Sequence, residues 1–197
     1  MKPKLILIGG GGHCAACIDV IEQEDKYQIA GIVDRDASNK TVLGYSNLGN
    51  DDDLRKLRSN YDYALITVGH IKNSLARVWI FEYINSLGFI LPIIISTRAY
   101  VSKHAVIGAG TIIMHDVLIN SRATIGSNCI INTKALIEHD ANVENNCHIS
   151  TGAIVNGGAV IRQGTFVGSN AVTKESVKTN ENDFIRAGTL FMGYAND

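Results

Sequence analysis

The stretch LIEHDANVENNCHIS, residues 136–150, sets one histidine between two acids. His139 follows Glu138 and precedes Asp140, and a second histidine, His148, stands nine residues further on. Histidine is the side chain best suited to accept a proton near neutral pH, and a carboxylate beside it can orient the ring and stabilise its charged form. These residue types indicate proton transfer at His139 with Asp140 as its partner. A solvated corner of a structural repeat is the competing interpretation.

A six-residue repeat runs through the second half of the chain. Twelve consecutive positions, six residues apart, hold aliphatic side chains: Val101, Ile107, Ile113, Ile119, Ile125, Ile131, Ile137, Val143, Ile149, Val155, Ile161 and Val167. The position two residues before each holds a small or medium side chain. This period fits a short strand followed by a corner, three to a triangular coil, better than it fits a helix or a long strand. The sequence therefore predicts a parallel β-solenoid of about four coils that ends near residue 172, before an irregular or edge-capping tail.

His139 departs from what the repeat requires. It is the second residue after an inward aliphatic, and the residues one coil away on either side are Ser121 and Gly157. A large imidazole between two small neighbours leaves open space beside the ring, which suits a site better than it suits packing.

The four cysteines do not form a convincing reactive set. Cys14 and Cys17 have the spacing of a redox or zinc pair, but the chain has no second pair of that kind. Cys129 and Cys147 fall on the small position of the repeat. We therefore expect reduced, structural thiols and no metal site.

The first half of the chain has the pattern of a nucleotide-binding βαβ unit. An apolar strand over residues 4–10 ends in the glycines 9–12, and a helix over 15–24 leads to a second strand ending at Asp34. Bare backbone and the N–H groups of a helix start can receive phosphate oxygens, and the acid can meet a ribose hydroxyl. Cys14 stands where the dinucleotide fingerprint has its third glycine, which argues against a dehydrogenase. A tight turn is the alternative explanation for the glycines.

The remaining elements complete a small α/β domain. We expect a short helix near residues 51–58, a strand over 63–69, a helix over 73–86 and a last strand over 90–96. The resulting organisation is a Rossmann-like domain over residues 1–98 and a β-solenoid domain with a C-terminal cap over 99–197.

Composition excludes several classes of partner. Lys and Arg number 18 against 19 Asp and Glu, so the formal net charge is −1 and no field would gather nucleic acid. The apolar run FILPIIIS is far shorter than the roughly 20 residues of a membrane helix. We therefore expect no nucleic acid or membrane partner and a cytoplasmic location.

The repeat resembles that of the left-handed β-helix acyltransferases. The units AVIGAG, ATIGSN and TFVGSN match the glycine form of that family's hexapeptide. The resemblance implies a left-handed helix, a homotrimer and acyl-coenzyme A sites between adjacent β-helices. With its small Rossmann-like domain, the chain is similar to NeuD/PglD-type nucleotide-sugar N-acetyltransferases, with acetyl-CoA as co-substrate and no permanently bound cofactor.

The resemblance also implies roles for particular residues. His139 corresponds to the general base, Asp140 to its partner and Asn132 to a positioning group. The substrate-binding residues implied are Gly9, Gly10, Gly11, Gly12, His13, Asp34, Asp36, Gly69 and His70. Those implied for acetyl-CoA are His148, Gly152, Gly157 and Gly158, with the Gly152 amide facing the thioester carbonyl. The segment VGHIKNSLAR is two residues longer than the usual form before Arg77, which puts Gly69 and His70 in doubt.

The reaction implied is acetyl transfer to the 4-amino group of a UDP- or dTDP-linked 4-amino-4,6-dideoxy sugar for surface polysaccharide biosynthesis. O-acetylation of a sialic acid or related sugar is the first alternative. A degenerate, non-catalytic sugar-binding solenoid is the second. The sequence does not choose between UDP and dTDP or define the stereochemistry of the sugar.

Overall fold

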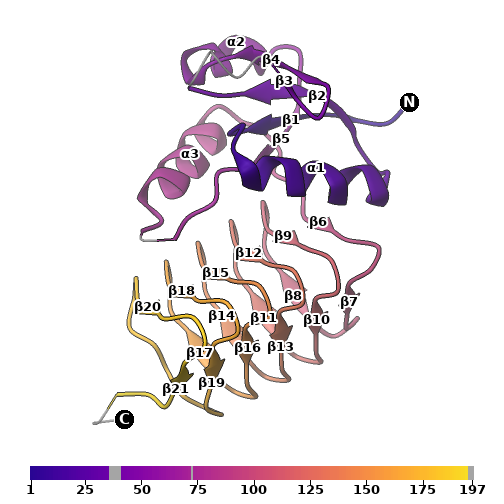
Figure 1. Ribbon diagram of the computed structural model, residues 1–197. Coiled ribbons are helices and arrows are strands. Elements are labelled where there is room, and N and C mark those ends of the chain that lie inside the picture. Colours follow the sequence, from indigo (N-terminus) through magenta and orange to yellow (C-terminus); the bar gives the residue numbers. More distant parts are fainter. Residues whose placement is uncertain (36–40, 72, 195–197) are drawn as a thin grey trace.

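The computed structural model describes residues 1–35, 41–71 and 73–194. An α/β unit at the N-terminal end lies on one side of a triangular β-solenoid (Figure 1). The predicted fold class, an α/β domain followed by a β-solenoid, is confirmed. None of the helices in the described ranges is long and apolar enough to cross a membrane.

The N-terminal sheet has five strands in the order β3-β4-β2-β1-β5. Its parallel members are β1 (Lys4–Ile8), β2 (Gln28–Val33), β4 (Tyr45–Gly49) and β5 (Tyr63–Ile66), and β3 (Thr41–Val42) pairs antiparallel with β4. Both faces of β1 are apolar, so helices cover both. Leu5 and Leu7 pack in a cluster with α1 (Gly12–Glu24), whereas Ile6 and Ile8 pack in a cluster with α3 (Leu75–Ser86).

Three details of this part of the chain differ from the prediction. The β3–β4 hairpin was not expected, and the short helical segment is split into η1 (Asp51–Asp53) and α2 (Leu54–Leu57). The strand predicted over residues 90–96 is wrong. Ile90 forms only an isolated bridge to Tyr63, and β6 (Ile94–Ile95) is the first rung of the solenoid. Pro92 separates the two pieces and has no N–H to continue a ladder.

The solenoid consists of three parallel sheets, which we name by their first strands. The β6 sheet contains β6, β9 (Ile112–Ile113), β12 (Ile130–Ile131), β15 (His148–Ile149), β18 (Phe166–Val167) and β20 (Phe184–Ile185). The β7 sheet contains β7 (Tyr100–Val101), β10 (Leu118–Ile119), β13 (Leu136–Ile137), β16 (Ile154–Val155), β19 (Val172–Thr173) and β21 (Leu190–Phe191). The β8 sheet contains β8 (Val106–Ile107), β11 (Thr124–Ile125), β14 (Asn142–Val143) and β17 (Val160–Ile161).

The repeat explains both the interior and the corners. The predicted aliphatic column and the small column, including Cys129 and Cys147, together form the solenoid core. Successive corners reach left-handed backbone at six-residue intervals, as at Asn128 (φ 57°), Lys134 (φ 61°) and Asp140 (φ 61°). Glycine takes the same place at several other corners.

The solenoid continues beyond the predicted end. β19, β20 and β21 add pairs to the stack as far as Phe191. Thr173 and Thr179 occupy the aliphatic column there and are buried. Their hydroxyls accept hydrogen bonds from the backbone N–H groups of Asn156 (3.0 Å) and Arg162 (2.8 Å). Because these polar atoms are satisfied inside the coil, threonine can replace an aliphatic residue.

Candidate active site

His139 lies at the corner between β13 and β14, and 58% of its side chain is exposed. Its Nδ1 is 2.7 Å from Oδ2 of Asp140. A carboxylate only accepts hydrogen bonds, so Nδ1 carries a proton in this pair, and in the neutral ring Nε2 is then the nitrogen that can accept one. A methyl group on Gly157 would come within 3.0 Å of Nε2 and of Cε1, so this edge of the ring lies over that glycine. The structure therefore brings the predicted pair into contact.

Asp140 is also held by a side chain that sequence analysis missed. Arg122, one coil earlier, donates its Nε to Oδ1 (2.6 Å) and its Nη2 to Oδ2 (2.8 Å). Hydrogen bonding from Arg122, and then from His139, holds the pKa of the Asp140 carboxyl well below its usual range. Asp140 is therefore ionised at neutral pH. The sequence contains the information needed to predict this contact, because Arg122 stands 18 residues before Asp140 and one coil is 18 residues long.

The amide of Gly157 differs from the equivalent amides at other corners. At three other corners, the backbone N–H in the equivalent position donates a hydrogen bond to the side chain of the residue before it. These pairs are Ser121 to Asn120, Thr133 to Asn132 and His139 to Glu138. Asn156 instead donates its side-chain amide to the carbonyl oxygen of Thr173 at 2.8 Å. Within the described ranges, the Gly157 N–H has no hydrogen-bond acceptor. It can therefore stabilise negative charge that develops beside His139.

A second group of predicted residues meets where the N-terminal domain packs on the β6 sheet. His148 donates its Nδ1–H to the carbonyl oxygen of His70 at 2.7 Å, and Asn132 Nδ2 is 3.3 Å from His148 Nε2. The rings of His70 and His148 contact each other edge to face, with centroids 5.4 Å apart. His13, in the first turn of α1, lies 3.4 Å from the Cys17 sulfur.

These three histidines are neutral at physiological pH. Burial, followed by the charges of Arg77 and His148, lowers the pKa of His13 to about 3. Burial and the neighbouring His148 lower the pKa of His70 to about 3, and burial lowers that of His148 to about 4. The three histidine rings beside Arg77 therefore carry no positive charge at neutral pH.

Arg77 joins the two parts of the chain. It is fully buried and donates to the carbonyl oxygens of Ile66 (2.9 Å), Val68 (2.8 Å) and Asn128 (3.2 Å). Ile66 ends β5, whereas Asn128 belongs to a solenoid corner. The guanidinium therefore fixes the loop after β5 against the solenoid.

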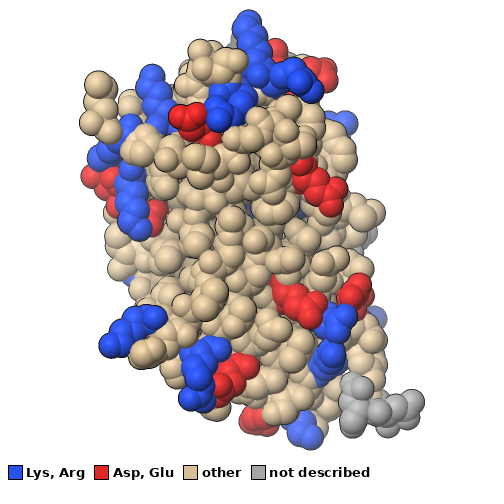
Figure 2. Space-filling model, turned by 180° about the vertical axis from the view of Figure 1, so that it is seen from behind, with Lys and Arg blue, Asp and Glu red and all other residues tan. Residues whose placement is uncertain are grey.

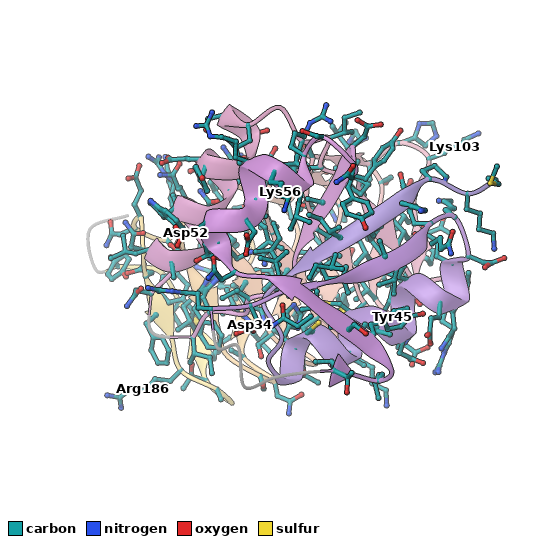
Figure 3. All side chains as sticks on the ribbon, turned by 90° about the horizontal axis from the view of Figure 1, so that it is seen from above. Asp34, Tyr45, Asp52, Lys56, Lys103 and Arg186 are labelled. Atoms are coloured by element: carbon teal, nitrogen blue, oxygen red, sulfur yellow. The ribbon has the colours of Figure 1, made fainter. Side chains whose placement is uncertain are left out.

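A crevice opens at the carboxyl edge of the five-stranded sheet. One hollow contains Gly9, Asp34, Arg35, Asp51 and Val68 in its lining, and an adjoining one is lined by Arg35, Asn50, Asp51, Asp52 and Trp79. Figure 3 shows Asp34 and Asp52 on one side of the view and Tyr45 on the other. Trp79 is 53% exposed and stacks on Tyr83 with centroids 5.3 Å apart. A flat exposed ring beside polar groups suits a nucleobase.

The four loop glycines differ in why they are glycine. Gly9 has φ 107°, and a methyl group there would lie 2.4 Å from the Val68 side chain. Gly10 donates its N–H to the Asp34 carboxylate, which a methyl group would crowd. Methyl groups on Gly11 and Gly12 would meet nothing within 4 Å. The turn explains the first two, whereas the last two leave an open surface at the start of α1.

Other predicted residues have structural surroundings of their own. Gly69 packs against His13, and His70 lines neither hollow of the crevice. Gly152 donates its N–H to the carbonyl oxygen of Thr133 at 2.9 Å. The expectation that this amide faces a thioester carbonyl is therefore wrong, because the stack of coils already uses it. Asp36 lies outside the described residues.

The predicted catalytic and coenzyme residues fall into two groups. His139, Asp140, Gly157 and Gly158 lie at the corner between the β7 and β8 sheets. Asn132 and Gly152 lie at the corner between the β6 and β7 sheets, with His148 on β15 beside them. In the described part of the chain no hydrogen bond or ion pair joins the two groups, and the width of the β7 sheet separates them.

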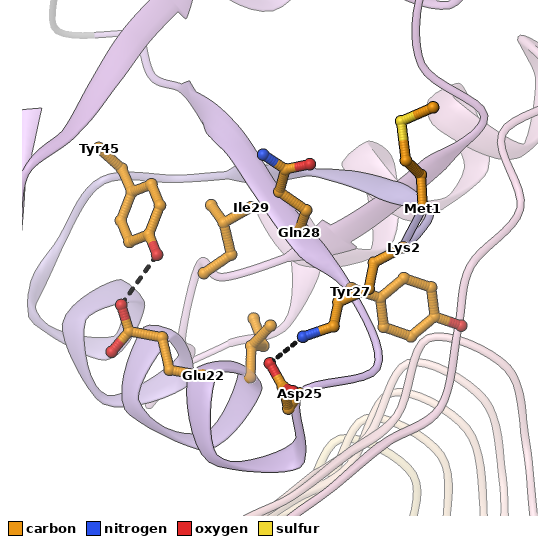
Figure 4. Close-up of a pocket in the computed structure, with 9 residues that line it drawn as sticks. Met1, Lys2, Glu22, Asp25, Tyr27, Gln28, Ile29 and Tyr45 are labelled. Atoms are coloured by element: carbon orange, nitrogen blue, oxygen red, sulfur yellow. Dashed lines mark hydrogen bonds and ion pairs between the residues drawn. The ribbon is translucent and has the colours of Figure 1, made fainter.

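Another hollow, of about 470 Å³, lies at the far end of α1. Figure 4 shows the ion pair of Lys2 with Asp25 and the hydrogen bond of Tyr45 to Glu22 across it. None of the predicted site residues lines this hollow. It lies toward the amino edge of the sheet, away from the carboxyl edge at which parallel α/β sheets bind ligands.

Two known protein families match separate stretches of the chain. Residues 4–83 match the PglD N-terminal domain, and residues 103–139 match the bacterial transferase hexapeptide (six repeats). These matches and the stacked parallel coils make the chain similar to left-handed β-helix transferases of the hexapeptide-repeat class, with an N-terminal domain similar to that of PglD. The resemblance inferred from the sequence is confirmed.

Solved structures extend the similarity over nearly the whole chain. The acetyltransferase domain of PglB from Neisseria gonorrhoeae FA1090, in complex with acetyl coenzyme A, is 27% identical, with 98% of this chain and 92% of that chain covered and a TM-score of 0.89. A variant of GDP-perosamine N-acetyl transferase from Caulobacter crescentus, in complex with CoA and GDP-perosamine, is 25% identical, with coverages of 96% and 93% and a TM-score of 0.70. WeeI from Acinetobacter baumannii AYE, at 16% identity over 96% of each chain and a TM-score of 0.50, shares the fold. No curated protein sequence matches the chain significantly.

Proposed function

We propose that this protein transfers acetyl from acetyl-CoA to the amino group of a nucleotide-linked sugar. The observation that carries the proposal is the His139–Asp140 pair at an open corner, with Nε2 of the ring over Gly157. The PglB acetyltransferase domain, solved with acetyl coenzyme A, and the GDP-perosamine N-acetyl transferase, solved with CoA and GDP-perosamine, support it.

The chemistry follows from the geometry of this corner. The sugar amine attacks the thioester carbonyl while His139 Nε2 removes a proton from the nitrogen, and Asp140 stabilises the imidazolium that forms. The Gly157 N–H, which has no acceptor within the described ranges, is the proposed donor to the tetrahedral oxyanion. Collapse of that intermediate breaks the C–S bond, forms the amide and releases coenzyme A as a thiolate, which the imidazolium proton can neutralise. No acyl-enzyme is needed.

The N-terminal crevice is the proposed site of the nucleotide. Gly11, Gly12 and the start of α1 offer open backbone to the diphosphate, Asp34 lies toward the ribose, and Trp79 offers a face to the base. This crevice favours a nucleotide-linked acceptor over a free sialic acid. Its carboxylates Asp51 and Asp52 could accept N–H groups of a base, so GDP sugars belong beside UDP and dTDP sugars in an acceptor panel.

We further propose that the chain forms a homotrimer with each active site between two copies. The His139 corner and the His148 group lie along the two opposite edges of the solenoid that border the β7 sheet. The outward residues of that sheet form an apolar stripe: Tyr100, Leu118, Leu136, Ile154, Val172 and Leu190. Figure 2 shows that the middle of the molecule's other face is also almost free of charged side chains. An apolar stripe such as that of the β7 sheet is typical of a contact with another protein.

Two experiments test these proposals. His139→Ala should lower the rate of thiol release from acetyl-CoA at least ~10²-fold while the oligomer stays folded. Near-normal turnover would refute the base assignment, and no turnover of the native protein with any acceptor would favour a non-catalytic solenoid. Co-expressing the inactive His139→Ala and Asp34→Ala chains tests the shared site. Recovered activity supports a site built from two copies, and none supports a site within one chain.

The proposed setting follows from the substrates. An enzyme that uses acetyl-CoA and a nucleotide-linked sugar as precursors is expected in the cytoplasm, and its acetylated product suits surface polysaccharide biosynthesis. A release assay with UDP-, dTDP- and GDP-linked 4-amino sugars, and with free sialic acid, would separate N- from O-acetylation.

A further inference from the structure

One carboxylate joins the candidate base to a cation on the neighbouring coil. Among the described residues, Oδ1 of Asp140 accepts from Arg122 alone (2.6 Å), whereas Oδ2 accepts from both Arg122 (2.8 Å) and His139 (2.7 Å). The two prongs of the guanidinium fix the plane of the carboxylate. That plane in turn determines where the His139 ring can donate its Nδ1–H.

We infer that Arg122 is a positioning residue for catalysis, which fixes Asp140 and reduces its pull on the proton of His139. This inference rests on the proposed role of His139 as the base. A lone carboxylate would stabilise the imidazolium and keep the base protonated to higher pH. A carboxylate already shared with a guanidinium does so less, so removing the guanidinium should strengthen the hold of Asp140 on the charged ring.

The other charged groups near His139 are directed elsewhere or are remote. Glu138 Oε2 accepts from the Asn120 side chain (2.9 Å) and from the His139 backbone N–H (3.2 Å), not from the ring. The neighbours one coil away, Ser121 and Gly157, are uncharged. Lys174 and Glu175 follow only two coils further on, in the columns of Glu138 and His139. Within the described ranges, Asp140 is therefore the charged group in contact with the ring, and Arg122 acts on the ring through Asp140.

The solenoid contains a matched ion pair with a different role. Arg98 donates to Asp116 through Nε (3.1 Å) and Nη2 (2.7 Å), again across 18 residues, and His115 precedes Asp116. The His115 ring bonds to Ser96 Oγ (2.6 Å) and Asp19 Oδ2 (2.7 Å) instead of to Asp116. Arg98→Gln thus removes the same kind of pair without touching the His139 corner.

The test compares three variants by their pH profiles. In Arg122→Gln, the acid limb of kcat/KM should move up by about half a pH unit, because the pair is exposed and solvent screens it. The plateau kcat should fall roughly three- to tenfold, because Asp140 loses its fixed plane. Arg122→Lys keeps the charge, so it should restore the position of the limb but only part of kcat. Arg98→Gln should change neither quantity.

The outcomes separate this inference from the proposed function. If His139→Ala is inactive but Arg122→Gln has the profile of Arg98→Gln, the inference about Arg122 is wrong and the base assignment stands. If His139→Ala keeps its turnover, the base assignment itself fails. A lower kcat in Arg122→Gln with an unmoved limb, and equal loss in Arg122→Lys, would reduce Arg122 to a structural ion pair and overturn the inference.

Discussion

Adding one methyl group at Gly157 should displace the candidate base without removing it. Gly157 is not in the left-handed region of backbone conformation, so alanine can adopt its geometry. The new methyl carbon would lie 3.0 Å from Nε2 and Cε1 of His139. Ordinary carbon contacts are about 3.5–4.0 Å, so the ring has to move by roughly 0.5 Å or more.

The size of the kinetic effect follows from that displacement. A misplacement of about 1 Å can cost on the order of 10²-fold in rate, so a shift of half that size should lower kcat roughly tenfold. KM for acetyl-CoA should change little if the glycine serves mainly to leave room for the ring. A raised KM with an unchanged kcat would instead mean that Gly157 leaves room for the coenzyme arm, and it would refute this reasoning.

A double-mutant cycle supplies the control. In a His139→Ala background the Gly157 methyl group meets no imidazole, so its effect on the midpoint of urea unfolding should disappear. Measuring the unfolding of all four proteins gives the coupling between the methyl and the ring. Equal destabilisation with and without His139 would show that the methyl clashes with something else.

Three further predictions concern the N-terminal domain and its contact with the solenoid. Trp79→Ala should raise KM for the nucleotide sugar about tenfold and leave KM for acetyl-CoA unchanged, as steady-state kinetics with each substrate varied would show. The pKa of His70 (about 3) and that of His148 (about 4) lie below the usual 6.5, so the unfolded chain binds protons first as the pH falls. The free energy of unfolding in urea should therefore decrease from about pH 6.5 downward, by roughly 5 kcal/mol at pH 4.5 for the two rings together; a flat profile would contradict the neutral, buried state of both rings. Arg77→Met should cost roughly 3 kcal/mol of stability, because it leaves buried carbonyls without donors, and a variant as stable as the native chain in urea would contradict this.

The sequence predicted the solenoid well because one local rule is repeated. Each coil needs an inward aliphatic, a small residue and a corner, so twelve matches in phase leave little freedom. The rule failed at Thr173 and Thr179, where backbone N–H groups satisfy buried hydroxyls. Hydrophobic periodicity does not register hydrogen bonding, and the predicted end was therefore too early.

Only those contacts of the candidate site that follow from spacing along the chain could be predicted from the sequence. His139 and Asp140 are adjacent in sequence, and Arg122 could have been found by counting back one coil. The meeting of His13, His70 and His148 depends on how two parts of the chain dock. That docking follows from contacts such as those of Arg77, which no repeat encodes.

The solenoid contains two sets of Arg, His and Asp, namely Arg98, His115 and Asp116 and Arg122, His139 and Asp140. Their spacing along the chain has a consequence for how this fold can change its chemistry. His139 follows His115 by 24 residues, which is one full coil and one further side. A corner motif moved by 18 residues would stay on the same edge of the triangular solenoid, whereas a move of six further residues would bring it to the next edge. On the first edge Asp19 and Ser96 take up both ring nitrogens of His115. The same three residue types thus join the two domains at one edge of the solenoid, whereas at the next edge they leave a histidine open to solvent, where we propose the base.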